Sequence, residues 1–259
     1  MRHWVFWAVI VLSMFHFLVT FALIYMKCQY STDVENRFLA RIMDQIQVFG
    51  TGASYERFLH RQAANVTILL AYAAVSLVAT DFHSGGMNFY LSKPIGKIHY
   101  LLGKGAALAG MTALLTWVPA MGLFVEVAVY SSDFRYAAEH THILLAITGY
   151  SLLLMTAPSL LAMATAATLR KTGAILVAWI GLLIVLPAFG GLLWRITHAR
   201  VWLFLSFPRN MEIVADGLFG TTRPQDEGNA AIALAIVVGV GAASIALVLN
   251  RLRAVEAAT

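Results

Sequence analysis

The residues best suited to contact a soluble partner lie in a short polar segment, 81–104, between two apolar stretches. It opens with an acidic residue and two adjacent glycines, which allow a flexible or tight entry. Pro94 cannot continue a helix and restricts the residue before it. Residues 87–91, between the glycines and the proline, therefore predict about one and a half turns of helix. Its aromatic and aliphatic side chains suit docking, because buried aromatic groups carry much of the energy of an interface.

Other chemistry-bearing patterns give little support for an enzyme. A phosphate-binding loop needs Gly-x-x-x-x-Gly-Lys-Ser/Thr, but Ile98 stands where the first glycine belongs and Gly105 follows Lys104. The His-Glu-x-x-His and Gly-x-Ser-x-Gly motifs are absent from the sequence. His140 and His142 are interpreted as loop residues rather than metal ligands. We therefore predict no enzyme activity, no metal site and no cofactor in this chain.

Composition predicts the class of fold. Hydrophobic residues make up 60% of the 259 residues and charged residues 12%, about half the charged fraction of a soluble domain. Backbone that crosses lipid must satisfy its own hydrogen bonds, so apolar stretches of this length predict helices. We expect an all-α membrane protein in which residues 1–259 form a single transmembrane domain. The six predicted spans are Trp4–Met26, Ala63–Thr80, Gly105–Val129, Ile143–Leu169, Gly173–Trp194 and Ala230–Leu249.

Lys and Arg predict the orientation. They are denser in the segments that lie inside if both termini are cytoplasmic, as the positive-inside rule requires. The tight loop at Arg170 and Lys171 contributes most to this prediction. The first span is interpreted as a retained anchor rather than a signal peptide, because it is long and lacks a small-residue cleavage site.

The outer loops and the spans carry further signals. Residues 34–49 predict an amphipathic helix on the outer membrane surface, and 201–205 an interfacial or re-entrant element. Glu126 lies about 33 Å of helix rise beyond Lys104, which predicts a solvated acid at the outer interface. His16, near the middle of the first span, is a weak candidate for substrate contact; hydrogen bonding to a neighbouring helix is the alternative. Prolines 119, 158 and 187 are expected to mark helix bends.

The order of these elements carries a resemblance to a known family. An acidic residue, a glycine pair, a Leu-Ser-Lys-Pro turn and a Gly-Lys pair fall between the second and third of six spans. This resembles the cytoplasmic segment of ABC transporter type-2 permeases, where a coupling helix docks on an ATPase subunit. The outer element before the last span agrees with the family pattern. The resemblance implies a coupling role for Asp81, Gly85, Gly86, Met87, Phe89, Tyr90, Leu91, Lys93, Pro94 and Lys104.

The resemblance also implies partners. ATP and Mg²⁺ would bind to the separate ATPase subunit, and a second permease copy or paralogue would pair along the first and fifth spans. Membrane lipid and an outer-side accessory protein complete the set, with no nucleic acid, in a bacterial or archaeal inner membrane. Family members usually begin with a basic elbow helix, whereas only residues 1–3 precede the first span here. The alternatives are a secondary transporter or channel without an ATPase, and a structural subunit of a larger membrane complex.

Overall fold

The computed structural model describes residues 4–30, 50–83, 97–130, 135–169 and 171–256. Every regular element in these ranges is a helix, and six helical runs are long and apolar enough to cross a membrane. The chain is therefore an integral membrane protein of the all-α class. The runs are α1 (Trp4–Tyr30); α3 (Gly52–Ala74) continued by η1 (Val75–Ala79) and α4 (Thr80–His83); α6 (Lys97–Leu115) with α7 (Trp117–Tyr130); α9 (Thr141–Leu169); α10 (Thr172–Ile180) continued by η3 (Gly181–Val185) and α11 (Leu186–Thr197); and α13 (Ala230–Glu256).

Two helices begin earlier than the apolar pattern predicts. The second begins at Gly52 rather than Ala63, and the third at Lys97 rather than Gly105. In the first turns of α3, Arg57 is exposed while other positions are buried against the bundle. Helical hydrogen bonds do not depend on apolar side chains, so an amphipathic helix extends beyond the apolar stretch that a hydropathy pattern detects.

The three prolines behave differently. The run from α6 to α7 breaks at Thr116, one turn before Pro119, whose nitrogen cannot donate to the preceding turn. Pro187 follows the π-helical segment η3, which accommodates the missing donor at the start of α11. Pro158 lies inside α9, which continues through it over 29 residues. Only the first and third prolines therefore coincide with a change of helix type or a break.

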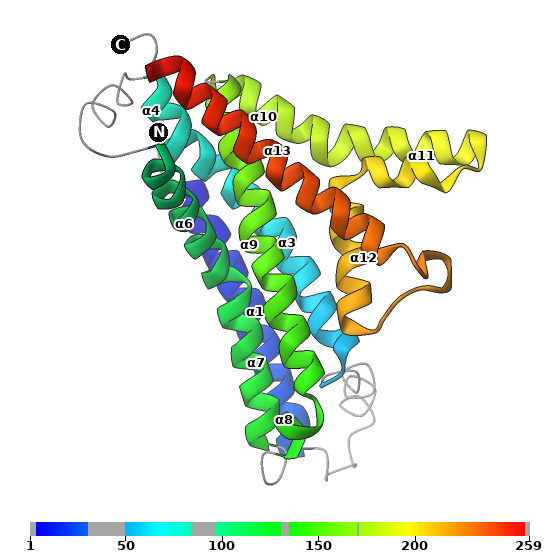
Figure 1. Cartoon of the computed structure of the whole chain (residues 1–259). Helices are drawn as coiled ribbons and strands as arrows, with labels where there is room; N and C mark the ends of the chain where they lie inside the picture. Colours follow the sequence, from blue (N-terminus) through cyan, green and yellow to red (C-terminus); the bar gives the residue numbers. More distant parts are fainter. Residues whose placement is uncertain (1–3, 31–49, 84–96, 131–134, 170, 257–259) are drawn as a thin grey trace.

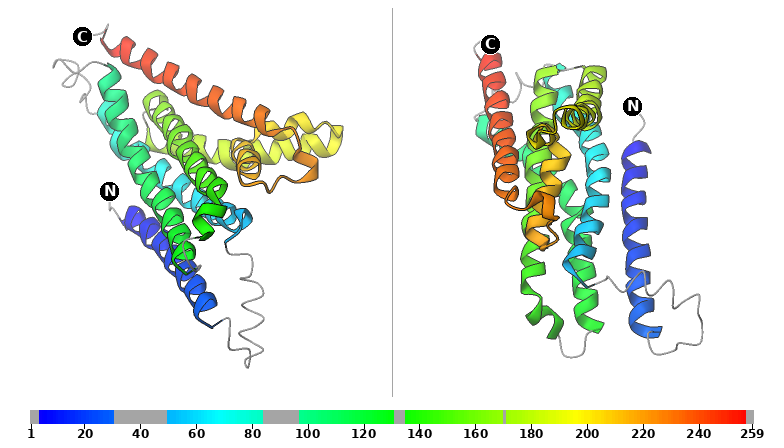
Figure 2. Two further views of the ribbon diagram at one scale, coloured as in Figure 1. Left: turned by 60° about the horizontal axis from the view of Figure 1, so that its bottom comes forward. Right: turned by 90° about the vertical axis from the view of Figure 1, so that its right-hand side faces the viewer.

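Helix α9 occupies the centre of the bundle and packs against α3, α6, α7, α12 and α13. The start of α1, the end of α4, the start of α6 and the end of α13 lie toward one end of the bundle (Figure 1). Helix α8 (Arg135–Glu139), the end of α7 and the start of α3 lie toward the other (Figures 1 and 2). We call these the α4 end and the α8 end. The runs α1, α3–α4, α6–α7 and α9 alternate between these ends, whereas the α10–α11 run extends sideways from the α4 end, across the direction of α9 (Figures 1 and 2).

The buried core falls into two main clusters along the bundle. The cluster nearer the α4 end includes Leu70, Leu108 and Met163. The cluster nearer the α8 end is more aromatic and includes Tyr55 and Tyr150. Each cluster joins side chains from α3 and α9 with those of neighbouring helices, so α3 and α9 form the frame on which other helices are placed.

The segment between the fifth and sixth spans folds back as a compact helical element. After the left-handed residue His198, the 3-10 helix η4 (Arg200–Leu205) packs along α11, where a side chain at Gly190 would meet the Trp202 carbonyl oxygen at 2.5 Å. Helix α12 (Phe207–Phe219) then packs against α3, α9 and α13. The predicted interfacial patch, 201–205, is thus helical and lies along α11, but none of its residues is buried, and Val201 and Leu205 are exposed. The predicted helix over 34–49 lies outside the described residues.

Candidate functional site

The two ends of the polar segment are joined by a small cluster of polar contacts at the α4 end. Lys104 Nζ lies 2.8 Å from Asp81 Oδ2 and donates to the carbonyl oxygen of Leu77 at 2.7 Å. The hydroxyl of Tyr100 donates to the same Asp81 oxygen at 3.1 Å. We call Asp81, Tyr100 and Lys104 the clamp. It fixes the end of α4 to the first turns of α6, and therefore fixes both points from which residues 84–96 depart.

The π-helical segment η1 supplies one of these contacts. In η1 the chain makes a wider turn, and Thr80 Oγ1 donates to the carbonyl of Val75, five residues earlier. The Leu77 carbonyl in this turn receives the Lys104 ammonium. Such π-segments within α-helices occur frequently at functional sites. A backbone oxygen within the wide turn is thus part of the clamp.

Burial strengthens the clamp. Only 22% of the Lys104 side chain and 17% of the Asp81 side chain are exposed, so water screens their attraction less than on an open surface. The Phe82 ring meets Tyr100 edge to face at 6.5 Å, and Lys104 Nζ lies 5.9 Å from the Tyr100 ring centre. An edge-to-face pair and a cation near a ring are both favourable. The clamp thus combines an ion pair, hydrogen bonds and aromatic packing.

The structure describes only part of the predicted coupling set and leaves its coupling role a prediction. Asp81 and Lys104 lie together in the clamp, whereas the remaining predicted residues lie outside the described ranges: Gly85, Gly86, Met87, Phe89, Tyr90, Leu91, Lys93 and Pro94. Sequence reasoning missed Tyr100. Its spacing of four residues before Lys104 places both on one face of a helix, which was the signal available.

His16 takes part in the contact between α1 and α3. Its ring stacks on Phe58 at 5.0 Å with an interplanar angle of 19°. Nearby, Gln62 of α3 is buried and donates across to the carbonyl of Ser13 at 3.1 Å. His16 thus packs between two helices by ring stacking, whereas the alternative to substrate contact was a hydrogen bond to a neighbouring helix.

Glu126 differs from its predicted environment. It lies in α7, where only 5% of the residue is exposed, and neither carboxyl oxygen receives a hydrogen bond from the described part of the chain. The prediction of a solvated acid was therefore wrong. Helix rise gave its depth along the span but not its neighbours. Tyr55 of α3 is close enough to Glu126 to interact with it electrostatically. The Tyr55 hydroxyl also lies 3.4 Å from that of Tyr136.

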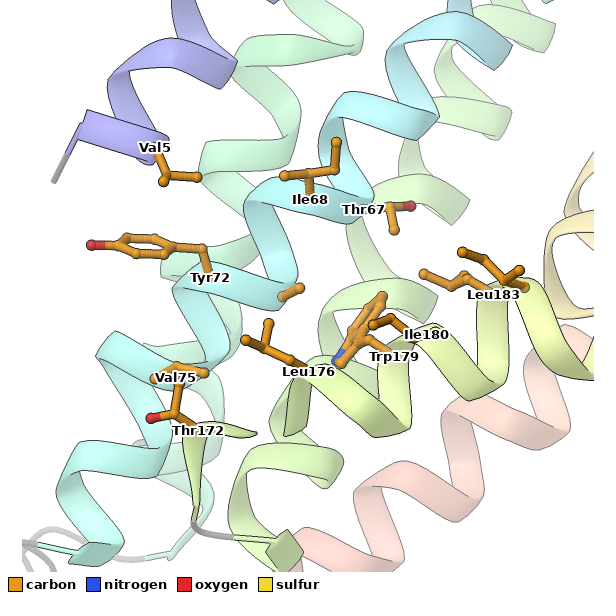
Figure 3. A pocket seen from close by; sticks show the side chains of 12 residues that line it. Val5, Thr67, Ile68, Tyr72, Val75, Thr172, Leu176, Trp179, Ile180 and Leu183 are labelled. Carbon is orange, nitrogen blue, oxygen red and sulfur yellow. The ribbon is translucent and has the colours of Figure 1, made fainter. Parts of the chain in front are cut away.

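An apolar groove of about 490 Å³ lies between α1, α3 and the α10–η3 run (Figure 3). Val5 borders it from α1, and Ile68 and Tyr72 from α3. On the third side, the Trp179 indole N–H donates to Thr165 Oγ1 at 3.2 Å, which fixes the ring. The volume falls within the range of small-molecule sites, about 300–1,000 Å³. The lining offers apolar contact rather than catalytic groups.

The fold and these sites define a helical integral membrane protein with a clamped polar segment at one end of the bundle. No protein-family model matches the chain, and a search of curated proteins found no relative.

Proposed function

We propose that this chain is the permease subunit of an ATP-driven ABC transporter. In this role it couples ATP hydrolysis by a separate subunit to export, or to conformational work across the membrane. The clamp is the observation that carries the proposal. It holds the base of the polar segment rigidly against the second and third spans, so a force applied to residues 84–96 is transmitted to those helices.

The proposed coupling requires more than a loop that happens to be polar. A lever must be stiff where it joins the moving body, and the clamp restrains both junctions of this segment. An ATPase surface that grips the aromatic residues of 87–91 would then displace α4 and α6 together. A secondary transporter needs no such connection between a loop and its spans.

The test is truncation of Phe89 and Tyr90 to alanine. Each buried aromatic contact at such a hot spot is worth about 2 kcal/mol. A loss of about 4 kcal/mol weakens association with the ATPase roughly a thousandfold, less if the two effects are not additive. Membrane insertion should persist, because the substitutions change no span. The measurement is co-purification with the ATPase from native membranes, together with ATP turnover.

His16→Ala is the control for that experiment. His16 packs between α1 and α3, far along the chain from the polar segment, so the variant should keep its ATPase. Full ATPase binding and full turnover by the Phe89→Ala/Tyr90→Ala variant contradict the coupling role and favour a transporter without an ATPase.

The proposal includes a second permease copy or paralogue seated on the first and fifth spans. Within one chain only 22% of the first span and 17% of the fifth are buried, against 50% of the fourth. Trp4, Trp7, Val11, Phe15 and Leu18 form an exposed apolar stripe along α1. A cysteine at Val11 is expected to crosslink to a second chain in native membranes, whereas one at buried Val9 is not. A stable monomer that transports would contradict the pairing.

The proposed orientation has a direct test. Lys171 and Glu227 are both exposed and lie on opposite sides of the fifth span in the proposed topology. After Cys28 is replaced, a cysteine at Lys171 should react with a membrane-impermeant reagent only from inside, and one at Glu227 only from outside. Labelling of position 171 from outside reverses the topology.

One observation favours a second candidate, an ion-coupled secondary transporter. Glu126 is a buried acid within a span, and an ionisable group in such a place is a functional candidate by default. Under this alternative, Glu126→Gln abolishes transport without affecting any ATPase. Under the ABC proposal the same variant continues to transport.

A further inference from the structure

A second polar cluster, far from the clamp, joins the end of α12 to the start of α3. The two helices meet closely, since a side chain at Gly52 would approach the Phe219 carbonyl oxygen to 2.5 Å. One turn further along α3, Glu56 Oε2 accepts a hydrogen bond of 2.6 Å from the hydroxyl of Thr221. The Thr221 amide in turn donates to the carbonyl oxygen of Asp216 at 2.9 Å. Glu56 is thus connected to the C-terminal cap of α12.

Asp216 faces this contact from α12 and is almost fully enclosed. Only 1% of the residue is exposed, and its Oδ2 receives no hydrogen bond within the described ranges. Arg223 Nε lies 4.0 Å from that oxygen, beyond hydrogen-bonding distance. A buried carboxylate oxygen without a donor costs free energy. The arrangement therefore lacks a proton donor at a position where the ionised acid needs one.

Another acid lies beside Asp216. The Thr221 hydroxyl that donates to Glu56 Oε2 at 2.6 Å also lies 3.3 Å from the carbonyl oxygen of Asp216, so one side chain touches both residues. A hydrogen bond between the two carboxyl groups fits this placement. Two ionised carboxylates can only accept hydrogen bonds and repel one another, whereas one proton between them makes a short, strong hydrogen bond. Carboxyl pairs that share one site hold one proton to higher pH than isolated acids.

The surrounding charges do not remove this repulsion. Arg209 is engaged elsewhere, at 2.6 Å from Glu212 and 2.5 Å from Asp226. Arg223 divides its charge between Glu212, at 3.1 Å, and the distant Asp216 oxygen. The charged and titratable groups around the pair are His60 from α3, beside Glu212; Tyr150 from α9; Arg209 and Glu212 from α12; and Arg223 and Asp226 after it.

The electrostatics agree with the geometry. Burial, then the hydrogen bond and negative charge of Glu56, raise the pKa of Asp216 from 3.8 to about 7, although Arg223 opposes the shift. By contrast, Glu212 keeps a lowered pKa: burial would raise it, but the hydrogen bond and charge of Arg209 and the charge of Arg223 prevail. Asp216 therefore keeps its proton to higher pH than Glu212, its neighbour on the same helix.

We propose that Glu56 and Asp216 share a proton that holds α12 against the start of α3, and that loss of this proton loosens the contact. The pair forms a proton-operated latch on the element that follows the fifth span. The latch lies about 37 Å along the second span from Asp81 of the clamp, at the opposite end of that helix. Acidification on the α12 side of the membrane closes it, and alkalinisation opens it.

The test uses the full chain in lipid nanodiscs, with melting temperature and a label distance measured between pH 5 and pH 8. For the distance, Cys28 is replaced and spin labels are placed at exposed Arg57 and Leu218. The melting temperature of the unmodified protein is expected to fall by several degrees as the pH rises. The distribution of distances between the labels at positions 57 and 218 is expected to broaden over the same range. In Asp216→Asn, which carries the hydrogen-bond donor permanently, both responses should disappear.

Two further variants separate the latch from other titrating groups. Glu56→Gln should also remove the pH response, which provides a second assay of the pair if the Asp216 variant folds poorly. His60→Asn should retain it, because the histidine faces Glu212 rather than forming part of the pair. A flat response in the unmodified protein overturns the latch. Persistence of the response in either acid variant, or its loss in His60→Asn, also overturns it.

Discussion

Removal of the Lys104 ammonium should destabilise the α4 end of the bundle. In Lys104→Met the flexible stem keeps its packing, while the ion pair to Asp81 and the hydrogen bond to the Leu77 carbonyl are lost. Loss of one partner from a largely buried pair leaves the other imperfectly solvated, at about 1–3 kcal/mol for each such group. With the Asp81 carboxylate still held by Tyr100, we expect a total loss of about 2–3 kcal/mol.

A double-mutant cycle with Asp81→Asn isolates the pair itself. Exposed ion pairs contribute about 0–1 kcal/mol, whereas breaking a fully buried pair costs about 3–5 kcal/mol. With side chains 17% and 22% exposed, the clamp lies between these limits, and a coupling energy of about 1–2 kcal/mol is expected. Reversible unfolding in mixed detergent micelles measures each of the four proteins in the cycle.

The pair Arg135 and Glu139 provides the matched control. Its charges lie 2.9 Å apart but are 80% and 56% exposed, so the same kind of cycle should give about 0–1 kcal/mol at most. If the coupling energy in the clamp is no larger than in this exposed pair, the clamp does not hold the base of the segment rigidly, and the mechanical argument for coupling fails.

Three other predictions concern packing and charge. Gly52→Ala should cost about 1–3 kcal/mol in unfolding experiments, because its new methyl group meets the Phe219 carbonyl, whereas Gly149→Ala has room and should change little. Glu126→Leu should raise the melting temperature, because the variant removes a buried acid that receives no hydrogen bond from the described part of the chain. A lower melting temperature for this variant would instead reveal a partner that binds the carboxylate. Because the pKa of Glu212 is lowered in the folded protein, its ionised form should stabilise the protein at any pH above 4.5, the ordinary pKa of a glutamate. This stabilisation should be lost as the pH falls below 4.5, and an acid unfolding curve of Glu212→Gln should lack that loss.

The spans were predictable because lipid imposes a simple rule on sequence. A crossing needs about 20 apolar residues, and six such stretches appear as six helical runs. The beginnings of α3 and α6 were not predictable in this way, since polar residues continue both helices beyond the apolar stretch. The apolar pattern marks the part of a helix that crosses lipid, and it does not mark the residue at which the helix itself begins.

Contacts between distant residues were the least accessible. Asp216 and Glu56 are separated by most of the chain, and only the docking of α12 on α3 brings them together. Glu126 was assigned a depth by counting residues, but its burial depends on helices that counting cannot place. Asp81 and Lys104 were named from the family resemblance; their contact with each other was not predicted, although they flank one short segment and chain connectivity keeps them near.

The π-segment η1 absorbs one residue within the second span. Its hydrogen bonds run from residue i to i+5, one residue further than in an α-helix, so the extra residue widens one turn and the helix beyond it keeps nearly the same phase. If one residue of Val75–Ala79 were deleted, the wide turn would close into an ordinary helix and Asp81 would stay on the side of Lys104. A deletion in the regular helix next to this segment would instead turn everything after it by about 100° and point Asp81 away from Lys104. The second span therefore has one short stretch in which the loss of a residue preserves the clamp, and that stretch is η1.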